Sequence, residues 1–182
     1  KNARGEIIAI SPRNGMYIYQ PSTGRQIKYD ESADLRRGLI HHYPLDAELD
    51  AQGNIWIGSP KGLCCRRASD GLFFHITDSI PYSGGLSSLT VPKIVKDDKD
   101  SLWIINDRSL VKLEYLNPLL LRAGGPAGII SDTTLYRFKK HYSGAALRDM
   151  HYLNGTFWLI QNGLAFYDPA SGKSRSFTHD EG

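Results

Sequence analysis

The fold of this chain is decided by three similar runs of sequence: Ile55-Trp56-Ile57-Gly58, Leu102-Trp103-Ile104-Ile105 and Phe157-Trp158-Leu159-Ile160. Each run holds one tryptophan in a short apolar stretch, and the tryptophans recur roughly every 50 residues, a period typical of propeller blades. One interval before the first tryptophan lies Ile7-Ile8-Ala9-Ile10, which we interpret as a degenerate copy. The chain therefore contains about four copies of one repeat.

Turn residues flank the runs in register. Three residues before each anchor stand Gly5, Gly53, Asp100 and Gly155, and a second turn position after it holds Gly15, Gly62, Ser109 and Gly163. Glycine reaches the positive φ angles that tight turns need. The segments between these turns are short and rich in β-branched and aromatic residues, which favours strands. In the last copy we expect strands near 147–153, 156–161, 164–168 and 173–178.

This arithmetic predicts an all-β chain, built of β-propeller blades that are four-stranded antiparallel sheets. The repeats span approximately 1–30, 38–78, 86–140 and 145–179. The first copy has no strand before Gly5, so we expect its sheet to lack the inner strand and the whole of 1–182 to be an incomplete propeller fragment. Neighbouring blades of the same parent chain are then expected partners.

The second strand of each copy is apolar without alternation, which suggests cover on both faces. We therefore predict that Trp56, Trp103 and Trp158 are equivalent buried core residues. Asp50 and Asp97 each precede a tryptophan by the same interval, and we expect them to brace turns.

The third copy is interrupted by an insertion at 117–134, which contains Leu119-Leu120-Leu121 and Gly124-Gly125-Pro126. One interpretation is a hairpin-like insertion that packs its own leucines. The other is a functional loop, because long loops in compact domains are often functional.

Bulk composition excludes several classes. The chain of 182 residues has a formal charge of +3, and its Lys and Arg residues are scattered, so we expect no nucleic acid partner. No apolar run is long enough to span a membrane. Cys64 and Cys65 are adjacent and too close for an ordinary disulfide, so we expect two thiols on opposite faces of a strand.

Two parts of the chain share an ordered motif. Gly85-Leu86-Ser87-Ser88, the run 91–98 that ends in Asp97-Asp98, and Leu102-Trp103-Ile104 follow one another, and 50–58 with Gly62-Leu63 repeats the later part. These residues resemble the two-component regulator propeller repeat, although the last copy has Tyr152 in place of the aspartate. The resemblance implies a periplasmic sensor region of a membrane-bound hybrid histidine kinase that responds to polysaccharide fragments.

We therefore expect a non-catalytic segment that senses an oligosaccharide or other small ligand, with a second copy of the chain as a candidate partner in a homodimer. The alternatives are a propeller enzyme acting on glycans, either a lyase or a hydrolase, and a protein-binding scaffold. No catalytic motif or cofactor fingerprint is present. Asp46, Glu48 and Asp50 begin like a calcium loop, but Gly53 and Ile57 do not fit its later positions, so we expect no metal.

Ligands of propellers usually contact the loops that join strands two and three and the loops that join successive blades. Amide, guanidinium and phenol groups in these loops suit hydroxyl-rich or anionic sugars. The candidate ligand-binding residues are Arg36, Arg37, Lys61, Tyr82, Asn106, Asp107, Arg108, Tyr142, Gln161 and Asn162.

Overall fold

The protein is described by a computed structural model that covers residues 5–77, 90–106, 108–130 and 135–177. The first sheet contains β1 (Ile7–Ser11), β2 (Gly15–Gln20) and β3 (Arg25–Tyr29). The second contains β4 (Asp46–Leu49), β5 (Ile55–Ser59), β6 (Gly62–Arg66) and β7 (Phe73–Ile76), joined by β11 (Gly128–Ile129). The third contains β8 (Lys93–Lys96), β9 (Leu102–Asn106), β10 (Ser109–Tyr115) and β12 (Tyr136–Ser143). The fourth contains β13 (Asp149–Leu153), β14 (Thr156–Gln161), β15 (Gly163–Asp168) and β16 (Lys173–Phe177).

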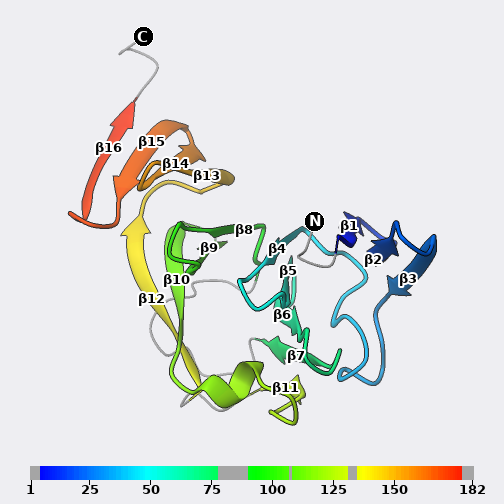
Figure 1. Ribbon diagram of the computed structural model, residues 1–182. Coiled ribbons are helices and arrows are strands. Elements are labelled where there is room, and N and C mark those ends of the chain that lie inside the picture. Colours follow the sequence, from blue (N-terminus) through cyan, green and yellow to red (C-terminus); the bar gives the residue numbers. More distant parts are fainter. Residues whose placement is uncertain (1–4, 78–89, 107, 131–134, 178–182) are drawn as a thin grey trace.

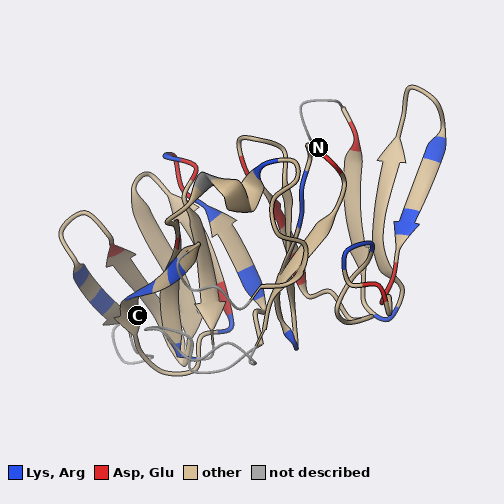
Figure 2. Cartoon of the chain, turned by 90° about the horizontal axis from the view of Figure 1, so that it is seen from below, with Lys and Arg blue, Asp and Glu red and all other residues tan. Residues whose placement is uncertain are grey.

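The four sheets follow one another along an arc in chain order (Figure 1), and the inner strands β4, β8 and β13 lie on its concave side. Strands that are consecutive within a copy pair as antiparallel neighbours. The predicted fold is confirmed: the chain is an open series of propeller-type sheets, and the first sheet has three strands within the described residues. Lysine, arginine and acidic residues are interspersed over the sheets rather than gathered on one of them (Figure 2).

Three apolar cores hold the series together, one at each boundary between sheets. Ile55 and Ile57 of β5 face the first sheet, whereas Trp56 between them faces the third. Trp103 faces the fourth sheet in the same way. Because successive side chains of a strand point to opposite faces, each second strand contributes to two cores at once. Cys64 and Cys65 also divide between two cores as predicted, and burial raises the pKa of both free thiols well above the ordinary value.

A carboxylate, buried at Asp50 and half-buried at Asp97, fixes the turn before each of two tryptophans. Asp50 accepts hydrogen bonds from the backbone amide of Asn54 at 2.8 Å and from the indole Nε1 of Trp56 at 3.0 Å. Asp97 does the same for the amide of Ser101 at 2.7 Å and for Trp103 at 2.8 Å. The prediction that these aspartates brace turns is confirmed, and the indole bond explains the fixed interval between aspartate and tryptophan.

Trp158 does not match the prediction of a buried equivalent. Its side chain is 36% exposed, whereas Trp56 is 0% exposed and Trp103 2%. Along β14, Trp158 and Ile160 are exposed while Phe157 and Leu159 are buried against the third sheet. The strand is therefore covered on one face only. Tyr152 stands at the position of the bracing aspartate, and its hydroxyl donates to Asp98 instead.

Glycine is required where the third strand of a sheet begins. A Cβ atom on Gly62, whose φ is +117°, would lie 2.1 Å from the carbonyl oxygen of Ile76 at the end of the outer strand. Gly163 has the same relation to Phe177. The third sheet has Ser109 at this position, and the pairing of β10 with its outer strand shifts register between Leu110 and Val111.

The insertion bridges the second and third sheets. Its short 3-10 helix η1 (Pro118–Leu121) places Leu120 in the core between these sheets, and β11 extends the second sheet by pairing in parallel with β7. Arg67 is fully buried beneath it. The guanidinium donates to the carbonyl oxygens of Leu120 at 3.5 Å and Pro126 at 2.5 Å, and it forms an ion pair with Asp70 at 3.0 Å. The insertion thus packs on neighbouring sheets rather than on its own leucines alone; its residues 131–134 lie outside the described part of the chain.

Replacement of the tryptophans should separate buried from exposed positions. We expect Trp56→Ala and Trp103→Ala each to lower the free energy of unfolding by about 3–5 kcal/mol, the usual cost of truncating a core aromatic. Trp158→Ala should cost about 1 kcal/mol or less, because surface substitutions have small effects. Urea unfolding with an unchanged m-value is the measurement. Equal losses at all three positions would contradict the asymmetry.

Removal of the Arg67 guanidinium should release the insertion. Arg67→Met keeps an apolar stem but removes the guanidinium from two carbonyls and from the Asp70 carboxylate, so we expect a loss of about 2–4 kcal/mol. Hydrogen exchange at the amide of Ile130, which donates to the carbonyl of His75, should become faster. Arg122→Met, an exposed change on the same insertion, is the control and should leave that exchange unchanged.

The same contact predicts a pH dependence. Burial acts to raise the pKa of Asp70, but hydrogen bonds from Arg67 and from the amides of Leu72 and Gly124 outweigh it and hold the pKa below the ordinary 3.8. A depressed carboxyl pKa stabilises the folded state above that pH, and the contribution is lost as the pH falls through the folded-state pKa. The variant Arg67→Met should therefore lose less stability than the parent chain upon acidification below 3.8.

Candidate functional site

Three of the predicted ligand-binding residues come together between the third and fourth sheets. The hydroxyl of Tyr142 donates to Gln161 Oε1 at 3.4 Å, and the backbone carbonyl of Arg108 accepts from the amide of Gly144 at 3.0 Å. A Cβ atom on Gly144 would lie 2.6 Å from Gln161 Oε1 and 2.7 Å from the Tyr142 hydroxyl. We call Arg108, Tyr142 and Gln161, together with the adjacent Asn162, the loop cluster.

The loop cluster offers hydrogen-bonding groups of several kinds. Gln161 Nε2 donates to the hydroxyl of Ser176 at 3.2 Å, which orients the amide. Arg108 and Asn162 are exposed, and no ion pair holds Arg108 within the described ranges. A guanidinium, an amide and a phenol on one rim can contact hydroxyl or carboxylate oxygens of a ligand.

The remaining candidates within the described residues do not join this cluster. Asn106 is buried and donates to the carbonyl of Thr90 at 3.2 Å, which makes it a structural residue of the third sheet. Lys61 lies 4.0 Å from Glu31, whose carboxylate also contacts His42 at 3.0 Å. The hydrogen bond from His42 holds the pKa of Glu31 below its ordinary value. Tyr82 and Asp107 lie outside the described residues.

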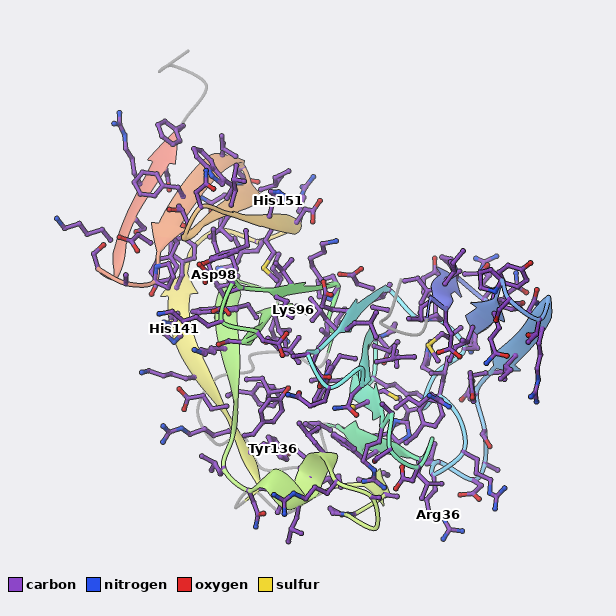
Figure 3. All side chains as sticks on the ribbon, viewed as in Figure 1. Arg36, Lys96, Asp98, Tyr136, His141 and His151 are labelled. Atoms are coloured by element: carbon purple, nitrogen blue, oxygen red, sulfur yellow. The ribbon has the colours of Figure 1, made fainter. Side chains whose placement is uncertain are left out.

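Arg36 and Arg37 occupy the outer end of the second sheet. The carbonyl of Arg36 accepts from the amide of Phe73 on β7, and its side chain approaches Gly128 of β11. Figure 3 shows Arg36 far from His151, which lies on β13 of the fourth sheet. Both arginines form ion pairs with Asp34, at 3.2 and 3.4 Å. The predicted ligand-binding residues that the structure describes therefore lie in separate places rather than around one site.

Sequence reasoning missed a groove of about 520 Å³ along the inner strands. Its walls combine charged residues from β4, β8 and β13 with an apolar side on the fourth sheet; we call it the inner-strand groove. The lining residues that carry charge or an aromatic ring are Asp46, Glu48, Lys93, Lys96, Asp149, His151, Tyr152 and Trp158.

One ion pair across the groove ties the second and third sheets together. Asp46 on β4 accepts from the backbone amide of Ile94 at 2.9 Å and pairs with the Lys93 ammonium at 3.3 Å. Lys96 pairs with Asp100 at 2.9 Å. The two lysines are thus already neutralised by carboxylates. A sequence signal existed, since these short inner strands carry charges whereas the adjacent strands β5, β9 and β14 carry none.

Among the described residues, no group of three or more histidine, cysteine or acidic side chains is placed to hold a metal ion. No helix in the described ranges is long and apolar enough to cross a membrane.

The arrangement of the four sheets is similar to that of known structures. The extracellular domain described as part of a hybrid two-component system, BT3049 of B. thetaiotaomicron, matches 95% of this chain at 18% identity and a TM-score of 0.71. The extracellular domain of BT4673 from the same organism matches 97% at 20% identity and a TM-score of 0.65. This chain has the sheet architecture of those extracellular domains. It spans about a fifth of their length, 22% and 21% respectively.

A third structure, described as a gluconolactonase, matches 98% of this chain and 62% of its own at 12% identity and a TM-score of 0.62. No protein-family model matches this sequence. No curated protein matches it either. The likeness thus concerns the fold, and these extracellular domains share with this chain the propeller-type sheets that the repeat predicted.

Proposed function

We propose that this chain is a ligand-sensing propeller segment of an extracytoplasmic two-component sensor, located in the periplasm, and that it senses an oligosaccharide without turning it over. The observation that supports this most is the fold shared, over nearly the whole chain, with two extracellular domains that are each described as part of a hybrid two-component system. The kinase of the parent protein and a homodimeric state remain predictions from the repeat resemblance.

The loop cluster supplies the chemistry that this proposal needs. Arg108 and Asn162 present free donors at the surface, while Tyr142 and Gln161 are held in place by hydrogen bonds. Such a mixture of fixed and exposed polar groups suits the hydroxyl groups of a sugar, because each hydroxyl both donates and accepts.

Binding measurements test the ligand class. Isothermal titration of the purified chain against neutral and uronic-acid oligosaccharides should find at least one that binds. Arg108→Ala should then weaken binding about tenfold, since a hydrogen bond to a charged group contributes about 1.5–3 kcal/mol. Arg25→Ala, an equally exposed arginine on the first sheet, should have no effect. Failure of every oligosaccharide to bind, or an equal loss in both variants, would count against the proposal.

A second candidate is an enzyme, favoured by the fold likeness to a protein described as a gluconolactonase. We expect no turnover from the chain. Incubation with gluconolactone and with the oligosaccharides that bind, followed by chromatography of the products, should show no chemistry above the buffer blank. Turnover that is lost upon Asp149→Asn or Glu48→Gln in the inner-strand groove would establish the enzyme instead.

A further inference from the structure

A cleft of about 760 Å³ lies where the second and third sheets meet the insertion; we call it the insertion cleft. It is lined by residues 51–52, 99–101, 112–115 and 121–122. These belong to the turns before β5 and β9, to β10 and to the end of η1. Arg108 of the loop cluster follows β9 whereas the cleft residues 99–101 precede it, so the two places lie at opposite ends of that strand. The volume is in the range of small-molecule sites.

Both acidic side chains that line the insertion cleft are neutralised by partners that do not line it. Asp100 pairs with the Lys96 ammonium at 2.9 Å, and it also accepts the backbone amide of Ala51 at 2.6 Å. Glu114 pairs with the guanidinium of Arg137 at 2.5 Å. The carboxylates of the cleft are therefore already satisfied, and they leave the charge of its basic residues uncompensated.

The basic residues of the cleft are Lys99, Lys112 and Arg122. The Lys112 ammonium lies 5.5 Å from the ring centroid of Trp103, a residue of the core between the third and fourth sheets, so it points out of the cleft. Lys99 and Arg122 are exposed, and neither forms an ion pair within the part of the chain that the structure describes. The third sheet and the insertion thus each present one free cation, and an anionic ligand can form charge-assisted hydrogen bonds with both.

The remaining wall of the cleft is apolar. Tyr115 and Leu121 are half-buried residues at the edge of the core between the second and third sheets. The hydroxyl of Tyr115 is buried and has no hydrogen-bond partner among the described residues. What a ligand can reach of this side chain is therefore apolar. A pyranose ring has an apolar face of C–H groups that can pack on such a wall, while its substituents contact polar groups around it.

The backbone of Asp100 marks the cleft as a special place in the repeat. Its φ is +60°, in the left-handed region, where the equivalent positions before the other anchors hold Gly5, Gly53 and Gly155. Glycine adopts this conformation without a steric penalty, whereas a residue with a Cβ atom does not. In return the Asp100 side chain binds the amide of Ala51 and so ties together the two turns that line the cleft. Backbone strain of this kind is concentrated at functional sites.

From this combination we propose that the insertion cleft binds an acidic sugar residue of an oligosaccharide. The sugar ring packs on Tyr115 and Leu121, and its carboxylate binds Lys99 and Arg122. Gln52, which is exposed on the same cleft, contacts the hydroxyl groups. The inference rests on the proposed function in taking the ligand to be an oligosaccharide. It adds a second site, apart from the loop cluster, and a requirement for negative charge.

NMR titration of the isotope-labelled chain locates the binding. The probe is trigalacturonate, and galactotriose of the same linkage is its neutral match. We expect trigalacturonate to shift the amide signals of Gln52, Ser101 and Arg122, and galactotriose to bind there at least about tenfold more weakly, because it lacks the charge-assisted hydrogen bonds. Added sodium chloride should weaken the binding of trigalacturonate, since exposed charges are screened by salt.

Matched variants test the two cations. Lys99→Gln and Arg122→Gln should each weaken the binding of trigalacturonate about tenfold. Lys173→Gln and Arg25→Gln, changes of an equally exposed lysine and arginine on other sheets, should leave it unchanged. Equal losses in all four variants would overturn the inference, because general attraction to a basic chain would then explain the binding.

The remaining outcomes separate the insertion cleft from the loop cluster. Equal shifts with both trisaccharides, equal shifts with sodium sulfate at the same concentration, or no shifts at the cleft amides would each overturn the inference. Shifts confined to Gly144 and lost upon Arg108→Ala would also overturn it, while the proposed function would stand. Failure of every oligosaccharide to bind anywhere on the chain would overturn both.

Discussion

A carboxylate that holds both a turn and an indole is the interaction on which the regular part of this structure depends. Asp50 and Asp97 satisfy turn amides with one oxygen and the Nε1 proton of a tryptophan with the other. A buried indole donor without a partner is costly. The contact therefore fixes the position of the largest side chain of each sheet, and the next sheet packs on that side chain. Where Tyr152 replaces the aspartate, the tryptophan that follows is exposed.

The fold could be predicted because it repeats. One glycine or one tryptophan is weak evidence, but the same turn residues at the same intervals in four copies are strong evidence for strands of defined length. The prediction that Trp158 is buried was wrong. Burial of this side chain depends on whether another sheet packs on its face of β14, and the sequence of the strand does not show that. The pairing of β11 with β7 could not be predicted either, since a two-residue parallel bridge has no periodic signal.

The candidate site was predicted in part. Loop position brought Arg108, Tyr142 and Gln161 to one place, since the turns after β9 and β14 and the connection between the last two sheets converge there. The same reasoning failed for Arg36, because the connection after the first sheet runs along the outer strand of the second. The inner-strand groove was missed because its residues come from strands that approach one another only in three dimensions.

The outer strands differ in a way that gives the insertion another role. The free edge of a sheet presents unpaired backbone groups that can recruit a second chain and start aggregation, and charged side chains discourage this. Of the four outer strands, β3 carries Arg25 and Lys28, β12 carries Lys139 and Lys140, and β16 carries Lys173 and Arg175. The outer strand β7, with the sequence Phe73-Phe74-His75-Ile76, has no lysine or arginine. It is also the strand whose edge β11 and the Arg36 carbonyl cover. The insertion therefore covers the edge of β7, the outer strand without lysine or arginine, and should disfavour pairing of that edge with a second chain.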